Sequence, residues 1–166
     1  MQEGSRAVGG AELPAALWGM SMGGAYATST ASLEPGKWRS LVIVSSFDSL
    51  DGLIGEQAAK RFGPVGPLLA TAVRGIARQR YQLDTTVVRP DLRAREVSIP
   101  VLVVHGTADP LIEMTRGRLL FESFASSEKK WIEVEDGTHD NVLVTPMPLY
   151  ATMAAWMIRH GSERTH

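Results

Sequence analysis

Two short runs of apolar, mostly β-branched residues constrain the fold of this chain more than any other feature. The runs are LVIV at residues 41–44 and VLVV at 101–104. Neither run alternates apolar with polar residues, so both favour strands that are covered on two faces, as in a parallel sheet. A third run, WIEV at 131–134, alternates in polarity and is expected at the edge of that sheet.

Helical patterns separate these strands. A further apolar run at 15–18 precedes the first of them. Strand–helix–strand alternation predicts right-handed crossovers and an α/β fold, a three-layer sandwich with a mostly parallel sheet flanked by helices. The predicted helices are an Ala-rich stretch from Gly23 to about Leu33 and residues 53–61, 68–79, 113–124 and 148–160.

Length and composition fit one globular domain. The chain has 166 residues, of which 44% are hydrophobic and 21% charged, and this balance excludes a disordered chain. Its 17 Lys and Arg nearly balance 18 Asp and Glu, so the totals show no basic excess for nucleic acid or an anionic membrane. The absence of cysteine excludes disulfides, thiolate metal sites and a cysteine nucleophile. Without a signal-like start or an apolar run of about 20 residues, a cytoplasmic protein is expected.

The domain organisation is expected to be simple. Residues 1–14 predict a frayed N-terminal segment, 15–161 the folded core and 162–166 a short tail. Within the core, residues 51–95 predict a cap-like or covering region of helices, with eight large apolar residues between positions 53 and 76. These either line an acyl pocket or cover the sheet, and we expect covering helices. Six arginines between positions 74 and 95 indicate a solvated face, or alternatively attraction of an acidic substrate group.

The first strand runs into the sequence GMSMGG at residues 19–24. Gly-x-Ser-x-Gly between a strand and a helix predicts a sharp turn that strains the backbone of Ser21 and exposes its hydroxyl. Gly19 and Gly23 are expected where a side chain would collide with neighbouring backbone. The N–H of Met22, at the start of the helix, can donate to an oxyanion. The alternative is a glycine-rich helix cap with an inert serine.

Polar residues also follow the other strands. The second buried strand ends in HGTADP at 105–110, so Asp109 lies in a turn where a carboxylate can hold a histidine in one tautomer. An Asp before a Pro is also a common turn or helix-cap residue, and this segment alone favours neither role for Asp109. His139 follows the edge strand and can accept a serine proton, although a lone loop histidine is usually solvated. Its neighbours Asp136 and Asp140 are expected to be solvated.

The set of three residues is more informative than each alone. Ser21, Asp109 and His139 follow different strands, and the carboxyl ends of parallel strands share one rim of the sheet. A serine hydroxyl is a poor nucleophile near pH 7 and needs such a base and orienting acid. Asp48, which follows the strand at 41–44, is the alternative acid, whereas His105 is expected to pack or bond locally.

These motifs resemble those of the α/β-hydrolase superfamily, most closely its serine-aminopeptidase-like and bacterial esterase-like branches, and the prolyl-oligopeptidase catalytic domain is similar too. The resemblance implies Ser21 as nucleophile, His139 as general base and Asp109 as acid. It implies hydrolysis of an ester or peptide-like acyl bond of a small molecule through an acyl-serine, with no metal or organic cofactor. The motifs that carry it are residues 19–24, 45–50, 105–109 and 137–139, within a match from about 15 to 161.

The chain departs from this superfamily before the serine. Members have further strands there and a loop, often His-Gly-Gly, that donates a second oxyanion N–H. The 20 residues before Ser21 hold no such loop, so the chain is expected to be the C-terminal half to two-thirds of the fold. Activity would then need another chain or segment, and the open edge favours a homo-oligomer or a complementing chain. The alternatives are a truncated, non-catalytic binding or assembly module and an acyltransferase.

Overall fold

The computed structural model describes residues 15–144 and 148–162 and contains one parallel sheet with the strand order β1-β2-β3-β4. This confirms the predicted α/β architecture. The expected frayed segment at 1–14 and all but the first residue of the expected tail lie outside the described residues. The strands are β1 (Ala15–Met20), β2 (Trp38–Val44), β3 (Val101–Gly106) and β4 (Lys129–Val134).

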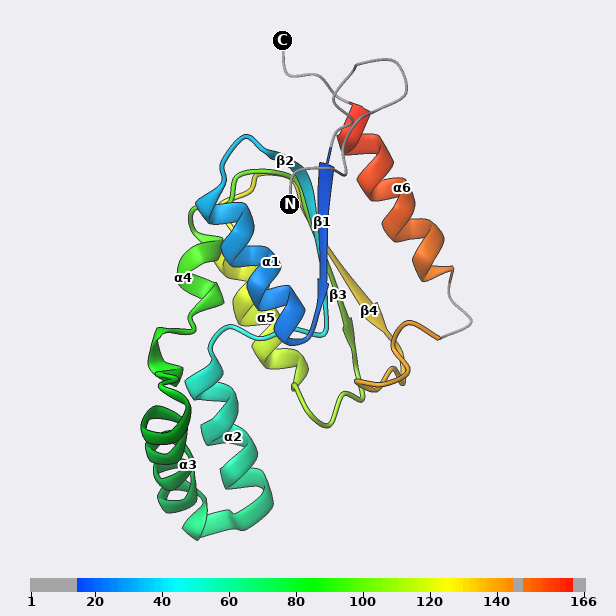
Figure 1. The fold of residues 1–166 in the computed structure, drawn as a ribbon. Helices are drawn as coiled ribbons and strands as arrows, with labels where there is room; N and C mark the ends of the chain where they lie inside the picture. Colours follow the sequence, from blue (N-terminus) through cyan, green and yellow to red (C-terminus); the bar gives the residue numbers. More distant parts are fainter. Residues whose placement is uncertain (1–14, 145–147, 163–166) are drawn as a thin grey trace.

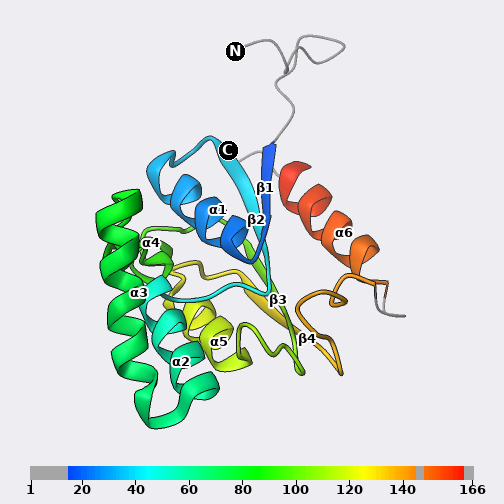
Figure 2. The same ribbon diagram turned by 60° about the horizontal axis from the view of Figure 1, so that its bottom comes forward.

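Helices cover both faces of the sheet (Figure 1). The first, fourth and fifth helices lie on one face and the last helix lies on the other, as Figure 2 also shows. The predicted helices are present with shifted ends, whereas the fourth, of five residues, is too short to give a periodic pattern. In the described part of the chain, no helix is both long and apolar enough to cross a membrane. The helices are α1 (Met22–Leu33), α2 (Leu50–Phe62), α3 (Gly66–Tyr81), α4 (Pro90–Ala94), α5 (Met114–Ser123) and α6 (Leu149–Ser162), with short 3-10 turns η1 (Gly63–Val65) and η2 (Thr85–Val87).

The two apolar runs form the centre of the core. Every residue of 41–44 and 101–104 is fully buried, as expected for strands covered on two faces. The odd-numbered residues of both runs pack against α1, α4 and α5, and the even-numbered residues pack against α6. Each such side chain contributes about 1.5–3 kcal/mol of burial free energy, so these runs hold the two helical layers on the sheet.

The two outer strands differ in character. β4 lies at one edge, as its alternating polarity predicts. β1 lies at the other edge and pairs with β2, and no other described strand pairs with it. The side chain of Trp18 in β1 is 46% exposed although it belongs to an apolar strand. The outer edge of β1 therefore presents unpaired backbone groups and apolar surface.

Helices α2 and α3 form a hairpin that stands away from the sheet. Figure 1 shows it beyond the carboxyl ends of the strands, and its helices pack mainly on each other. The turn between them is tight, because a Cβ on Gly66 would lie 2.5 Å from the carbonyl oxygen of Ala58. Phe62, Leu68 and Ile76 are each more than half exposed.

The sequence left region 51–95 as either cap-like or covering, and the hairpin does not lie over the sheet. At the end of this region, α4 does cover the sheet, with Ala94 fully buried in the core. Part of the basic charge is locally neutralised, since Arg74 forms an ion pair with Asp51 and Arg89 one with Asp91. The structure thus divides the region into a projecting hairpin and a short covering helix.

Candidate active site

The turn between β1 and α1 holds Ser21 in an unusual backbone conformation. Its φ of 54° and ψ of −126° lie outside the regions that residues with a side chain normally occupy. The Ser21 N–H donates to the carbonyl of Val44 at 2.9 Å, and the Gly24 N–H donates to the Ser21 carbonyl at 3.0 Å. The sharp, strained turn expected from the sequence is present, and bonds to both neighbouring elements maintain it.

Only one of the two glycines predicted to be required in this turn is constrained as expected. A Cβ on Gly19 would lie 2.2 Å from the carbonyl oxygen of Gly23, so glycine is required at position 19, as predicted. The predicted collision at Gly23 is wrong, because its Cβ would meet no described atom outside its own helix within 4 Å. Gly24 carries this constraint instead, since its Cβ would lie 2.8 Å from the Cβ and Oγ of Ser46.

Ser46 is a site residue that the sequence reasoning missed. It is 1% exposed, follows β2, and its Oγ donates to the backbone carbonyl of Ser21 at 2.8 Å. Its position, two residues after the apolar run at 41–44, could have indicated this role. A buried hydroxyl at that point needs a hydrogen-bond partner, and the neighbouring strand end supplies one.

The loop after β3 holds the carboxylate of Asp109 in a buried position. Its side chain is fully buried, and its Oδ1 accepts hydrogen bonds from the N–H groups of Leu111 at 2.9 Å and Ile112 at 2.8 Å. These donors replace the water that the carboxylate gave up on burial. Oδ2 is thereby directed away from the loop backbone.

The second oxygen of this carboxylate meets the imidazole of His139. The distance from His139 Nδ1 to Asp109 Oδ2 is 2.8 Å, and the His139 side chain is 12% exposed. With a proton on Nδ1 donated to the carboxylate, Nε2 keeps the lone pair that can accept a proton. Among the described residues, no hydrogen bond joins His139 to the hydroxyl of Ser21, a contact that often tightens only when substrate binds.

Two glycines fix the Asp109 and His139 loops against each other. A Cβ on Gly106 would lie 2.1 Å from the carbonyl oxygen of Gly137, so the two backbones touch. The N–H of Ala108 donates to that same carbonyl at 3.0 Å, and the N–H of Asp136 donates to Thr107 Oγ1 at 2.9 Å. The sequence predicts no role for these glycines, because the contact joins segments about 30 residues apart.

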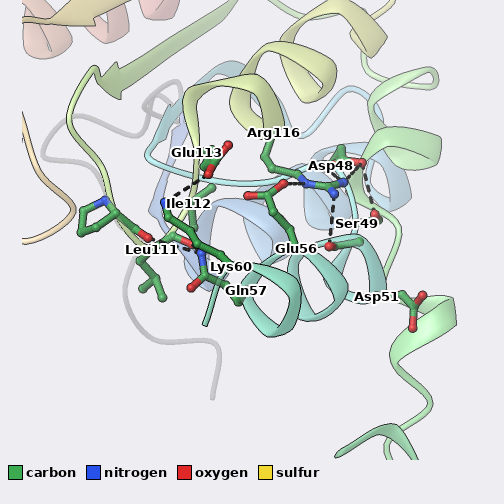
Figure 3. Close-up of polar contacts among 12 residues, drawn as sticks. Asp48, Ser49, Asp51, Glu56, Gln57, Lys60, Leu111, Ile112, Glu113 and Arg116 are labelled. Atoms are coloured by element: carbon green, nitrogen blue, oxygen red, sulfur yellow. Dashed lines mark hydrogen bonds and ion pairs between the residues drawn. The ribbon is translucent and has the colours of Figure 1, made fainter. Parts of the chain in front are cut away.

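Asp48, the alternative acid, has different partners. Its carboxylate accepts from Arg116 Nη1 at 3.1 Å, while Arg116 Nε donates to Glu56 Oε2 at 2.7 Å (Figure 3). Burial alone would lower the pKa of Arg116, but the carboxylates of Glu56 and Asp48 raise it above its ordinary value. Asp48 therefore helps to tie α2 to α5, and Asp109 is the carboxylate that contacts His139.

The placement of His105, Asp136 and Asp140 agrees with the expectation from the sequence. His105 is fully buried and bonds locally to the carbonyl of Ile112, while Asp136 and Asp140 are exposed. In the ranges 15–144 and 148–162, no group of three or more His, Asp or Glu side chains is placed to hold a metal ion.

Comparison with known proteins identifies the fold. No protein-family model matches the chain, and no curated protein matches it. Solved structures match it with TM-scores above 0.6: Rv0554 from Mycobacterium tuberculosis (0.62, 16% identity), the monoacylglycerol lipase of Paleococcus ferrophilus (0.62, 21%) and the acylaminoacyl peptidase of Pyrococcus horikoshii (0.66, 13%).

The similarity covers most of this chain but only part of the others. It spans 89%, 89% and 91% of this chain, and 66%, 69% and 24% of the three proteins in the same order. At such low identity the similarity defines the fold rather than the activity. Over the part that it spans, this chain has the fold of the α/β-hydrolases.

Proposed function

We propose that this chain carries the catalytic residues of a serine hydrolase that cleaves an ester or peptide-like acyl bond. Ser21 is the nucleophile, His139 the general base and Asp109 the acid. The observation that carries this proposal is the 2.8 Å contact between His139 Nδ1 and the buried Asp109 carboxylate, at the rim where Ser21 occupies a strained turn. Similarity to the fold of a lipase and a peptidase supports the same chemistry.

The reaction follows from the properties of these groups. The Ser21 hydroxyl attacks the acyl carbon while His139 Nε2 accepts its proton, and the Asp109 carboxylate stabilises the imidazolium that forms. Met22 begins α1, so its N–H is one of the free donors of the helix start and can bind the oxyanion. The imidazolium then protonates the leaving group, which departs and leaves an acyl-serine. Water, deprotonated by His139, releases the acid and restores the serine.

Labelling with a fluorophosphonate probe tests this assignment. The serine attacks phosphorus and displaces fluoride, so labelling reports an activated serine without knowledge of the substrate. We expect Ser21→Ala to abolish labelling and His139→Ala to reduce it strongly. The matched control is Ser29→Ala on α1, whose hydroxyl bonds its own helix at Ala25 and should leave labelling unchanged. Equal labelling of Ser21→Ala and the unaltered chain would overturn the assignment.

A second function, a non-catalytic assembly module, is favoured by the edge of the sheet. β1 has one strand partner among the described residues and exposes Trp18, the arrangement that invites another chain to add a strand. This alternative predicts an intact fold without labelling, and self-association that rises with concentration. Size-exclusion chromatography of the chain, run beside the labelling assay, separates the two functions.

A further inference from the structure

We propose that His105 is a positioning residue for Asp109: its Nε2–H donates to the carbonyl of Ile112 and so fixes the backbone whose N–H groups hold the Asp109 carboxylate. His105 itself would touch neither substrate nor the reacting atoms. The inference deepens the proposed function and rests on it for the role of Asp109 as acid, whereas the positioning itself can be measured without activity.

A short chain of hydrogen bonds leads from His105 to His139. His105 Nε2 lies 2.8 Å from the carbonyl oxygen of Ile112, and the N–H of that residue lies 2.8 Å from Asp109 Oδ1. The other carboxylate oxygen lies 2.8 Å from His139 Nδ1. Displacement of residue 112 would therefore rotate the carboxylate away from His139.

The surroundings of His105 fix which of its nitrogens carries the proton. The side chain is fully buried, and Nδ1 has no hydrogen-bond partner within the part of the chain that the structure describes. Nε2 faces a carbonyl oxygen, which can only accept, so the neutral ring carries its proton there. A second proton on Nδ1 would place an unpaired donor in a buried site.

Burial outweighs the neighbouring Asp109 charge and keeps the His105 ring neutral. Asp109 Oδ2 lies 3.9 Å from Nε2, and Trp131 of β4 stacks on the ring at a centroid distance of 5.9 Å. Burial lowers the pKa of His105, and the nearby His139 acts in the same direction. The Ile112 carbonyl and the Asp109 charge raise this pKa without overcoming burial. His105 thus remains a neutral donor near pH 7.

The same loop has a second anchor that serves as an internal comparison. Gln57 of α2 donates its Nε2 to the carbonyls of Leu111 at 2.9 Å and Pro110 at 3.3 Å, in the region that Figure 3 shows. This contact is exposed, so water replaces it when the side chain is removed. The contact of His105 is buried, and no water can take its place without opening the core. The inference therefore assigns positioning to His105 and predicts little effect at Gln57.

The experiment observes the Nδ1 proton of His139 by NMR in protein labelled with ¹⁵N-histidine. A proton held between imidazole and a buried carboxylate gives a low-field resonance, assigned by its loss in His139→Gln. His105→Phe keeps a ring but removes the donor, and we expect the resonance to be lost. His105→Gln restores it, because the amide nitrogen of Gln lies at the same distance along the side chain as Nε2. Gln57→Ala is the control and should keep it.

A second variant covers the case in which His105→Phe fails to fold. A Cβ on Gly117 of α5 would lie 2.3 Å from His105 Nδ1, so Gly117→Ala displaces the ring from outside while favouring the helix. It should also lose the resonance. The inference is overturned if the unaltered chain lacks the resonance, or if a folded His105→Phe or Gly117→Ala retains it unchanged.

Labelling kinetics distinguish this inference from the proposed function. If the proposed function and the positioning role both hold, His105→Phe lowers the maximal labelling rate on the order of 10²-fold and leaves probe binding unchanged. His105→Gln should then recover the labelling rate. If the unaltered chain shows the resonance pattern but no labelling, the proposed function fails and the positioning role stands. If the chain is labelled and folded His105→Phe is labelled at the same rate, the positioning role fails alone.

Discussion

The Oγ of Ser46 donates a hydrogen bond of 2.8 Å to the backbone carbonyl of Ser21, so the residues after β2 brace the turn after β1. We expect Ser46→Ala to lower the free energy of unfolding by about 1 kcal/mol, because a partly buried hydrogen bond is lost. Labelling of Ser21 should slow as its backbone relaxes. Urea unfolding and probe kinetics measure the two effects. Ser123→Ala, which removes a solvent-exposed hydrogen bond to the carbonyl of Leu119 within α5, should change neither by a measurable amount.

Adjacent glycines provide a matched pair of substitutions. Gly24→Ala places a Cβ 2.8 Å from Ser46, and we expect a loss of about 1–3 kcal/mol in the free energy of unfolding from overpacking. Gly23→Ala meets nothing outside its own helix among the described residues and should stabilise α1 by up to about 1 kcal/mol. Urea unfolding of both variants checks this contrast, and similar stabilities would contradict the assigned packing.

The contact between the two rim loops gives a further prediction. Gly106→Ala would place a Cβ 2.1 Å from the carbonyl oxygen of Gly137, which forces the loops apart. We expect the Asp109–His139 contact to break, with loss of the low-field His139 resonance and of most labelling. Gly75→Ala, on α3 with no described atom outside its own helix within 4 Å of the new Cβ, is the control. Unchanged labelling in Gly106→Ala would show that the loops move independently.

Burial of His105 makes stability depend on pH. Its folded-state pKa is lowered from the ordinary 6.5, mainly by burial, so the unfolded chain binds the proton first. The free energy of unfolding should therefore fall as pH decreases below about 6.5, down to the lowered pKa. Urea unfolding between pH 7.5 and 5 should show a steeper fall for the unaltered chain than for His105→Gln. If the free energy of unfolding fell equally with pH in both proteins, His105 would not be the cause of the pH dependence.

Local patterns predicted the sheet and the placement of the polar residues along its rim. The apolar runs at 41–44 and 101–104 needed no tertiary information, because only buried strands accommodate them. The positions of Ser21, Asp109 and His139 after three different strands predicted their common edge. The contact between Asp109 and His139 then follows from β3 and β4 being neighbours.

Contacts between segments far apart in the chain could not be predicted from local patterns. Whether Gly23 or Gly24 must stay small depends on Ser46, which follows the next strand. The contact between Gly106 and Gly137 depends on how closely the loops after β3 and β4 approach each other. The hairpin of α2 and α3 has an apolar pattern like that of a covering helix, and its packing partner decides where it lies. Periodicity cannot supply such pairings.

The projecting hairpin has a consequence for how this scaffold can vary. Helices α2 and α3 pack mainly on each other. Ion pairs of Arg116 with Asp48 and Glu56 attach the hairpin to α5. Because the hairpin packs mainly on itself, it can be lengthened, shortened or replaced as one unit while the strands keep their register. The loops that carry Asp109 and His139 touch at Gly106 and Gly137, so they tolerate no such insertion. Grafting experiments on this chain should therefore begin at the hairpin.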